Sequence, residues 1–429
     1  MEVKPGYKQT EVGLIPEEWD VRELLSLTRS HNSGIYKRQA LYGHGFNIVG
    51  VSDIYGIDKV DGQSFAYVPL SAQERAKHTL HCNDLLYSES SLVREGIART
   101  VYVAERGAGT AFAWHTRRYS VEQRMLLPSY LYYYLQSRPA RAHMVSQSIQ
   151  TAITGINTVA YFACPIIVPP FAEQEAIAEA LSDADALIES LERLAAKRRQ
   201  LQQGTMQALL TGKKRLPSFS GEWEVKPLSD LFNFSGGFTA SRDQLSSEGH
   251  CYLHYGDIHT SMKSFVDVSS EFQDIPKLDI PLKNVSSVSL LDDGDVVFVD
   301  ASEDDEGTSK HVVVINPDGL PFISGLHTIV AKCKTNALEH QYRRYCFQTA
   351  AVKDQFRFFA VGTKVSGISK TNIARVTLLV PSVPEQTAIS NILSDMDADI
   401  VALETKLAKA RQLKQGMMQE LLTGRIRLI

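Results

Sequence analysis

The chain of 429 residues contains few cysteines and no long apolar run. Its five cysteines are scattered, odd in number and include no Cys-x-x-Cys pair, so we expect neither a disulfide framework nor a structural zinc site. No stretch approaches the roughly 18 apolar residues of a membrane-spanning helix. Residues 1–10 lack the apolar core of a secretory signal. We therefore expect a cytoplasmic protein with no membrane partner.

The sequence also lacks a strong net charge, since 45 Lys and Arg stand against 49 Asp and Glu. Residues 1–170 carry 17 basic against 15 acidic side chains, and residues 217–383 carry 15 against 21. A basic surface is the usual electrostatic footprint of a nucleic-acid binder. Charge alone therefore predicts no such partner.

Catalytic motifs are missing as well. No Gly-x-x-x-x-Gly-Lys-Ser/Thr phosphate loop is present, so we expect no ATP site. His250, His254, Asp257 and His259 form the one cluster that could suggest a metal site. The segment 251–256 is predicted as a strand and turn, in which residues four apart do not form the helical metal-binding face. We expect no catalytic residue, cofactor or metal in this chain.

What the sequence does contain is an internal repeat. Residues 173–216 align without a gap on residues 385–428, at an offset of 212, and 27 of the 44 positions are identical. Shorter similarities extend the repeat toward the N-terminal side of each copy: Glu18–Val21 with Glu222–Val225, Val51–Ile54 with Tyr255–Ile258, and Thr154–Ile156 with Ser366–Ile368. The repeat predicts one architecture built twice.

The repeat predicts an α+β protein with two mixed α/β domains joined by two long helices. The expected boundaries are 1–170 and 217–383 for the domains, and 171–216 and 384–429 for the helical segments. Runs such as Val101–Val103, Asp295–Val299 and His311–Ile315 are typical of strands. One helix is predicted in each domain, at Pro128–Gln136 and Leu338–Thr349.

The two long segments have the periodicity of coiled-coil helices, with apolar residues spaced alternately four and three apart. The predicted seam consists of Ile177, Leu181, Ile188 and Leu191 in the first copy and Ile389, Leu393, Met396, Ile400, Leu403 and Leu407 in the second. Each helix is acidic in its first half and basic in its second, which favours an antiparallel pair with a pseudo-twofold axis. A helix of about 40 residues would span about 60 Å.

These motifs resemble those of the specificity (HsdS) subunit of type I restriction-modification systems. The resemblance covers essentially the whole chain. It rests on the paired Glu-Gln…Leu-Ser-Asp-x-Asp…Gln-Gly-x-Met-Gln-x-Leu-Leu-Thr-Gly blocks at 173–212 and 385–424 and on the entry motif Gly13–Trp19.

The resemblance implies a non-catalytic subunit with two target-recognition domains, each reading half of a split sequence in double-stranded DNA. The helices would set the spacing between the half-sites and dock two adenine-N6 methyltransferase subunits. Restriction subunits would join this complex, so that S-adenosylmethionine, ATP and magnesium are expected on the partner subunits. The assembled complex would act as a type I deoxyribonuclease and DNA methyltransferase.

Base readout needs hydrogen-bond donors and acceptors carried on loops. The candidate loops follow predicted strands or precede the shared Gly-Ile step at matching points of the two repeats, so we expect them on one face. The candidates are Ser33, Tyr36, Lys37, Arg38, Ser88, Ser90, Arg94, Gln150 and Thr151 in the first domain, and Thr239, Ser241, Arg242, Asp300, Ser302, Glu303, Thr363, Lys364 and Ser366 in the second.

Two alternatives stay open. The acidic run 303–306 would repel phosphates and is compatible with an ordinary exposed loop. A non-DNA adaptor that bridges two protein partners through a coiled coil is compatible with the acidic second domain. A fusion enzyme with its own methyltransferase is disfavoured, because the two domains and two helices leave no room for one.

Overall fold

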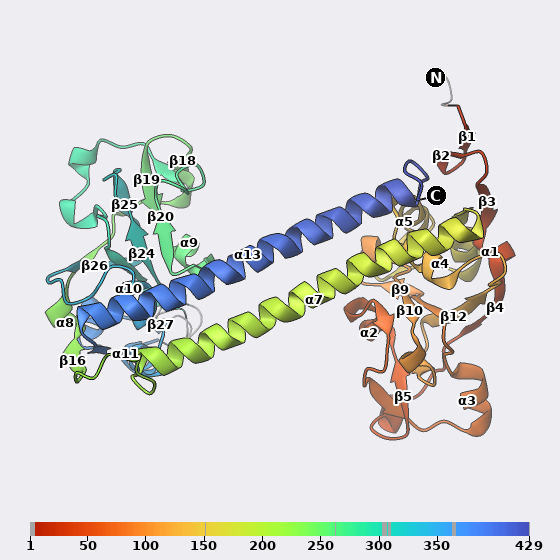
Figure 1. The fold of residues 1–429 in the computed structure, drawn as a ribbon, viewed down its shortest axis with the longest axis horizontal. Coiled ribbons are helices and arrows are strands. Elements are labelled where there is room, and N and C mark those ends of the chain that lie inside the picture. Colours follow the sequence, from red (N-terminus) through yellow and green to blue (C-terminus); the bar gives the residue numbers. More distant parts are fainter. Residues whose placement is uncertain are drawn as a thin grey trace. The chain divides into compact units, whose positions relative to one another are not determined.

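The fold was taken from a computed structural model, which describes residues 5–150, 152–261, 263–302, 307, 310–362 and 366–428 (Figure 1). The chain divides into two compact units: Met1–Glu192 with Thr405–Ile429, and Arg193–Glu404. Two long helices, α7 (Phe171–Leu210) and α13 (Val383–Leu421), each contribute one part to each unit. The first unit therefore combines two segments that are distant in the sequence, whereas the second unit is one continuous stretch.

The first unit is built on a five-stranded sheet with the order β4-β12-β8-β10-β6. The β10–β6 pair is parallel and the other pairs are antiparallel. The predicted strand Val101–Val103 falls within this sheet. Its strands are β4 (Thr28–Ser33), β6 (Lys59–Val60), β8 (Leu85–Ser88), β10 (Thr100–Val103) and β12 (Thr116–Val121).

The second unit repeats this sheet strand for strand, in the order β17-β26-β22-β24-β20. Again the last pair, β24 with β20, is parallel and the others are antiparallel. The predicted strand His311–Ile315 is β24. The remaining strands are β17 (Phe232–Gly236), β20 (Phe265–Asp267), β22 (Val296–Val299) and β26 (Thr328–Cys333).

Smaller sheets accompany the main sheet in each unit. In the first unit they are β1 (Tyr7–Thr10) with β2 (Gly13–Pro16), β3 (Asp20–Glu23) with β15 (Pro165–Val168), β11 (Ala111–Phe112) with β5 (Phe46–Val49) and β7 (Ala66–Val68), and β13 (Ile149–Gln150) with β14 (Thr154–Gly155) and β9 (Ser90–Ser91). In the second unit they are β16 (Glu224–Pro227) with β28 (Thr377–Val380), β18 (Leu245–Ser246) with β21 (Lys277–Leu278), β19 (His250–Leu253) and β25 (Phe322–Ser324), and β23 (Ala301–Ser302) with β27 (Ser366–Gly367).

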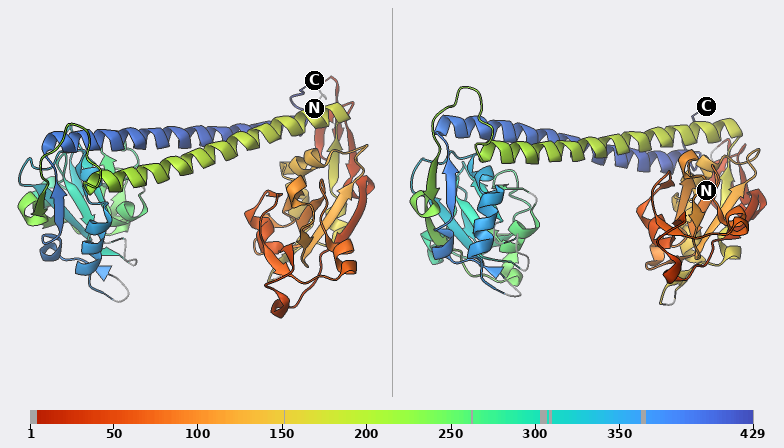
Figure 2. Two further views of the ribbon diagram at one scale, coloured as in Figure 1. Left: turned by 60° about the horizontal axis from the view of Figure 1, so that its bottom comes forward. Right: turned by 90° about the horizontal axis from the view of Figure 1, so that it is seen from below.

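Short helices pack around these sheets, and Figure 2 shows that in each unit, taken by itself, the sheets lie on one side of the long helices. The first unit contains α1 (Leu24–Leu27), α2 (Val51–Gly56), α3 (Ala72–His78), α4 (Pro128–Tyr134), α5 (Arg138–Ser146) and α6 (Thr158–Phe162); the second contains α8 (Leu228–Leu231), α9 (Tyr255–Thr260), α10 (Arg343–Cys346), α11 (Ala350–Phe359) and α12 (Lys370–Ile373). Helix α4 coincides with the predicted helix at 128–136. No helix in the described part of the chain is long and apolar enough to cross a membrane.

The helix predicted over Leu338–Thr349 is wrong in its extent, since only Arg343–Cys346 is α-helical within it. The side chain of Glu339 accepts hydrogen bonds from the backbone of Gln341 and Tyr342, which holds the chain in a turn before the helix. Thr349 then caps a separate helix, α11. Local side-chain to backbone bonds therefore interrupt the helical pattern.

Helix α9 is a second difference, because residues 251–256 were predicted as a strand and turn. The strand β19 ends at Leu253, and the helix begins at Tyr255. The side chain of His254 caps this helix by accepting a hydrogen bond from the backbone of Gly256 at 3.0 Å. An N-cap histidine gives no strong sequence signal for a helix start.

Ion pairs show the relative direction of α7 and α13 inside each unit. In the first unit Asp185 pairs with Lys414 at 2.5 Å and Glu192 with Arg411 at 2.6 Å. The residue number falls along α13 as it rises along α7, so the segments run in opposite directions. In the second unit Arg199 pairs with Glu404, and Gln202 bonds Asp397, in the same antiparallel sense. All predicted seam residues are buried or partly buried.

The ends of the long helices are part of the hydrophobic cores. In the first unit, Ile177 and Leu181 of α7 and Leu421 of α13 belong to the same core as Trp19. In the second unit, Leu209 of α7 belongs to a core with Ile389 and Leu393 of α13 and with strands of the main sheet. Each domain core is therefore completed by both helices.

A buried carboxylate anchors the helices in each unit, and we call this arrangement the Trp-Glu-Arg latch. In the first unit Glu173, which is 1% exposed, accepts a hydrogen bond from Trp19 Nε1 at 2.7 Å and two from Arg427 at 2.6 and 2.9 Å. Hydrogen bonds to Glu173 and Glu18 raise the pKa of Arg427. The latch joins the N-terminal part of the chain to the start of α7 and to the segment after α13.

The second unit contains the same latch, composed of Glu385, Trp223 and Arg215. Glu385 is 1% exposed and accepts from Arg215 at 2.7 and 2.8 Å and from Trp223 Nε1 at 3.1 Å. Because a buried carboxylate is costly unless it is paired and hydrogen-bonded, all three side chains are needed together. The same three contacts recur in both units.

The glutamines beside these carboxylates make a second duplicated contact. Gln174 accepts from Leu127 N at 2.8 Å and donates to Met125 O at 3.0 Å. Gln386 accepts from Glu339 N at 2.7 Å and donates to Ala337 O at 2.7 Å. In each unit the glutamine amide bonds to backbone groups of the segment that precedes a short helix, α4 in the first unit and α10 in the second.

We predict that Glu173→Gln destabilises the first unit by about 2 kcal/mol. The amide can still accept from Trp19, but it removes the buried negative charge that pairs with Arg427, which then keeps only Glu18 as a carboxylate partner. The partial exposure of Arg427 reduces the cost. Urea unfolding monitored by tryptophan fluorescence measures the effect. Glu175→Gln, an exposed neighbour on α7, is the control, and equal stability of the two variants would contradict the latch.

Candidate nucleic-acid interface

In the first unit, the ends of the central strands bring the predicted DNA-binding segments together. Ser33 at the end of β4 pairs with Arg117 of β12, and the adjacent Thr116 pairs with Ser88 at the end of β8. The small sheet adds the third segment, since Thr154 of β14 pairs with Ser91 of β9. The segments that carry the candidates Ser33, Ser88 and Gln150 therefore adjoin at one end of the main sheet.

The second unit has the same arrangement. Gly236 at the end of β17 pairs with Ile329 of β26, so the segment 239–242 leaves the sheet at this end. Ser302 of β23 pairs with Ser366 of β27, which joins the two remaining predicted segments. The backbone N–H of Asp300 donates to the carbonyl of His327 at 3.1 Å. This bond joins the segment before β23 to the turn before β26.

The predicted contact residues differ in exposure. Exposed side chains belong to Tyr36, Arg38, Arg94, Gln150, Thr239, Ser241 and Arg242, and partly buried ones to Ser33, Lys37, Ser90, Asp300 and Ser366. Thr151, Glu303, Thr363 and Lys364 lie outside the described residues. Ser88 and Ser302 were predicted to contact DNA, but both side chains are buried in the structure. The hydroxyl of Ser88 donates to the carbonyl of Ser90 at 2.5 Å and closes the turn.

Several basic candidates already have acidic partners. Lys37 lies 2.8 Å from Glu74, and its ammonium group is the main cause that lowers the pKa of Glu74 to about 2. Arg242 lies 3.1 Å from Asp257. Arg38 is exposed, and within the described part of the chain no ion pair holds its guanidinium group. Arg38 is therefore the candidate that is most available to a new partner.

A turn that sequence reasoning missed lies among these segments in both units. It spans Ala113–Thr116 in the first unit and Gly325–Thr328 in the second, and the threonine hydroxyl donates to the first carbonyl at 2.6 Å in each. His115 and His327 occupy the third position with φ of 63° and 59°, a left-handed conformation that is unfavourable for histidine. The recurrence of His-Thr at an offset of 212 was the available sequence signal.

One glycine in each unit permits a close approach to this turn. A Cβ atom on Gly34 would lie 1.9 Å from the carbonyl oxygen of Ala113, and one on Gly237 would lie 1.7 Å from that of Gly325. Only glycine allows these backbones to approach so closely. The candidate loops of the two units are therefore held by the same backbone framework.

Side chains on this shared framework are different in the two units. In the first unit Tyr36 and Trp114, which are 63% and 50% exposed, make an edge-to-face contact at 5.3 Å. The corresponding turn in the second unit carries Leu326, while His327 contacts Asp300 at 3.3 Å. Sequence reasoning did not select Trp114, although an exposed tryptophan beside a tyrosine is typical of binding surfaces.

Comparison with known proteins agrees with this duplicated framework. The family described as type I restriction modification DNA specificity domain matches the chain twice, over residues 16–197 and 220–412. The chain belongs to this family. Each match covers one recognition domain and most of the helix that follows it.

Relatives of the type I specificity family match almost the whole chain. The putative type I restriction enzyme MjaX specificity subunit of Methanocaldococcus jannaschii is 22% identical, with coverage of 99% of this chain and 97% of the relative. The crystal structure of the type I S subunit from M. genitalium has a TM-score of 0.57 at 13% identity, covering 98% of each chain. A structure from work on assembly and conformational transition of the type I R-M system has a TM-score of 0.54 at 14% identity, covering 96% and 99%.

As a member of the type I specificity family, the chain is a DNA target-recognition subunit with two specificity domains. The family description assigns it specificity, not catalysis. The alternative of a non-DNA adaptor is not favoured, because the family match includes both domains as well as the helices.

The residues of the histidine cluster that could have suggested a metal site bond to separate partners. Partial burial is the main cause that lowers the pKa of His254, which favours the neutral imidazole that accepts from Gly256. Asp257 bonds Arg242, and His259 bonds the carbonyl of Ala301. Within the described ranges, no group of three or more His, Cys, Asp or Glu is placed to hold a metal ion.

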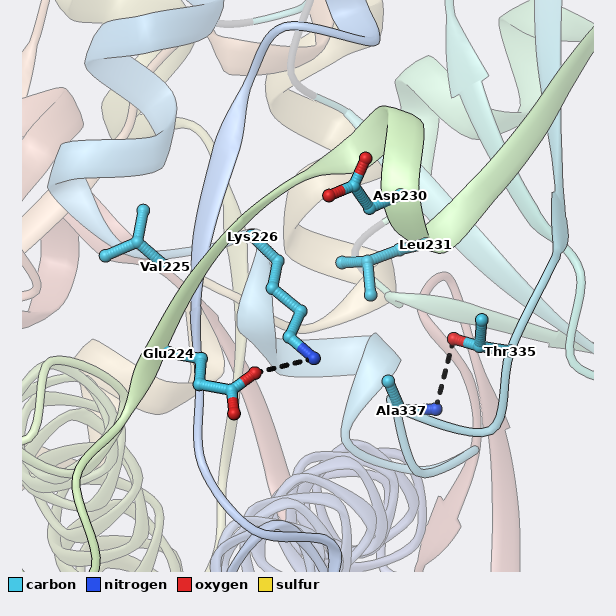
Figure 3. Close-up of a pocket in the computed structure, with 7 residues that line it drawn as sticks. All are labelled: Glu224, Val225, Lys226, Asp230, Leu231, Thr335 and Ala337. Carbon is cyan, nitrogen blue, oxygen red and sulfur yellow. Dashed lines mark hydrogen bonds and ion pairs between the residues drawn. The ribbon is translucent and has the colours of Figure 1, made fainter.

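The second unit has a hollow whose lining residues are drawn in Figure 3. It is lined by residues of β16, α8 and the segment after β26, and Lys226 within it already pairs with Glu224 at 2.7 Å. Helix α8 directly precedes β17, whereas the candidate DNA segment follows the other end of that strand. We therefore assign this hollow no part in recognition.

We predict that Gly34→Ala and Gly237→Ala each destabilise their own unit by more than about 2 kcal/mol, because the new methyl group would overlap a carbonyl oxygen. Gly155→Ala and Gly367→Ala are matched controls, since their methyl groups meet nothing closer than 3.8 and 3.5 Å. Thermal unfolding measures all four. Equal unfolding temperatures across the set would show that the close approach is not a real constraint.

Proposed function

We propose that the chain reads a bipartite target in double-stranded DNA, with one recognition domain on each half-site. The main support for this proposal is that the same backbone framework occurs in both units and displays different side chains at the same loop positions. A duplicated frame supports two related readings, and different loops support two different base sequences.

In this proposal, α7 and α13 form an antiparallel coiled coil that acts as the spacer between the half-sites. The four functional segments are residues 1–170, 171–216, 217–383 and 384–429, related by a pseudo-twofold axis. Support comes from the antiparallel ion pairs within each unit, the buried seam and the Trp-Glu-Arg latches. A rod anchored in both domain cores is suited to transmit a fixed separation.

The same helices would dock two adenine-N6 methyltransferase subunits, one near each domain, and through them the restriction subunits. Leu201 and Leu413, which are equivalent in the repeat, are both exposed, at 53% and 63%. A duplicated exposed leucine supports docking of one partner twice. S-adenosylmethionine, ATP and magnesium would reside on these partners, whose chemistry gives the complex its type I nuclease and methyltransferase activities.

We predict that deleting one heptad from each helix, residues 189–195 and 406–412, shortens the gap between the half-sites by about 3 base pairs. Seven residues remove about 10 Å of rise and rotate the helix by only about 20°. Methylome sequencing of a host that carries this chain with its methyltransferase measures the gap. An unchanged gap in a methylating complex would refute the spacer.

We also predict that Arg38→Ala relaxes base discrimination about tenfold in the first half-site only, because the exposed guanidinium can bind a base edge. Competition binding with duplexes altered in either half measures this effect at two salt concentrations. Arg29→Ala removes the same charge from the opposite end of β4 and serves as the control. An equal loss over both half-sites would contradict the assignment.

A further inference from the structure

An exposed aliphatic cluster lies among the loops of the first recognition domain, and we call it the aliphatic tip. It consists of Leu92, Val93, Ile149 and Ile153, which are 87%, 61%, 63% and 52% exposed. Leu92 follows Ser91 in β9, and Ile153 precedes the paired residue in β14, while Ile149 lies on β13 beside them. Clustered exposed aliphatic residues of this kind mark an interaction surface.

The turn that carries Leu92 is firmly supported. The backbone of Val93 donates to Ser91 Oγ at 3.2 Å, and Tyr55 Oη donates to the carbonyls of Ser90 and Gly96 at 2.8 and 3.2 Å. Arg141 donates to the carbonyl of Glu95 at 2.6 Å. These bonds hold the turn on both sides, so the exposure of Leu92 is a consequence of an ordered conformation.

The repeat indicates which kind of partner this tip contacts. Ser91 corresponds to Ser302, so Leu92–Glu95, with the sequence Leu-Val-Arg-Glu, corresponds to Glu303–Glu306, with Glu-Asp-Asp-Glu. A surface that docks the same methyltransferase on both halves must be duplicated, and this one is not. A surface that reads the part of the target that differs between the halves must itself differ.

We propose that Leu92 is an apolar wedge that enters a base step of the first half-site and partly unstacks it. This inference rests on the proposed function. Leucine is among the side chains that insert between base pairs, where the exposed base faces replace water around the aliphatic group. The neighbouring Arg94 is exposed, and among the described residues its guanidinium group donates only to the carbonyl of Val145 at 3.4 Å, so in this proposal it turns to the flanking phosphate. Val93, Ile149 and Ile153 form the apolar shoulder of the wedge.

The wedge would distort the DNA in the first half-site and not in the second. The acidic residues at the corresponding positions of the second domain cannot enter an apolar base stack, so only the first half-site is unstacked at a position other than the methylated adenine. Base flipping by a methyltransferase would, by contrast, affect the target adenine in both halves.

The test uses the complex with its methyltransferase subunits and duplexes of the mapped target in which 2-aminopurine replaces single bases. We expect a severalfold rise in fluorescence at one step of the first half-site, outside the target adenine, and none at the matching step of the second. Leu92→Ala abolishes this rise and weakens binding about tenfold, whereas Leu92→Met retains both. Leu25→Ala, an exposed leucine on α1 that precedes the opposite end of β4, behaves as wild type.

Three outcomes would overturn the wedge. If the wild-type complex binds its target but Leu92→Ala leaves fluorescence and affinity unchanged, Leu92 does not enter the DNA, and the proposed function stands. If Leu92→Ala loses co-purification with the methyltransferase, the tip is a protein-docking surface. If the wild-type complex binds no specific duplex, the proposed function itself fails, and the wedge with it. Thermal unfolding of Leu92→Ala, expected to match wild type because the side chain is exposed, excludes misfolding.

Discussion

The buried carboxylate at the start of each long helix is the interaction on which the rest of the structure depends. Glu173 and Glu385 are each only 1% exposed, so each needs an arginine and a tryptophan from elsewhere in the chain. In the first unit these partners lie before and after the stretch that forms the second unit, so the first unit is completed only by the C-terminal part of the chain, whereas the latch of the second unit closes within the stretch Arg193–Glu404. The same electrostatic requirement therefore joins both long helices to each core.

The duplicated contacts have a structural role, whereas the loop residues at the ends of the sheets differ between the units. Interior groups such as Gln174 and Gln386 satisfy backbone atoms at equivalent places, and a change in one copy would leave buried polar groups unpaired. Polar groups at the exposed loop ends do not need a protein partner, because water can replace a lost hydrogen bond there. The repeat consequently preserves the latches, the main sheets and the close approaches at Gly34 and Gly237, while Trp114, Leu92 and their counterparts are free to differ.

Sequence patterns predicted the regular elements best where one physical signal dominates. The heptad spacing and the repeat located the starts of α7 and α13 within one residue, although the helices end at Leu210 and Leu421, before the predicted segments end at 216 and 429. The β-branched run at His311–Ile315 matched β24. Prediction was poorer where a single side chain decides the backbone, as with Glu339, which interrupts a helix, and His254, which starts one. The burial of Ser88 could not be read from its loop-like neighbours, because it depends on the strands that surround it.

Duplication, helix periodicity and the absence of catalytic motifs were legible in the order of the residues, since each depends on spacing along the chain. The sequence did not show which side chains lie together, because Trp19 and Arg427 contact Glu173 from 154 and 254 residues away along the chain. The convergence of three loops at one end of each sheet, the strained histidine turns and the protruding Leu92 are likewise products of strand pairing. Contacts between residues so far apart are decided by packing, and packing is a property of the folded chain.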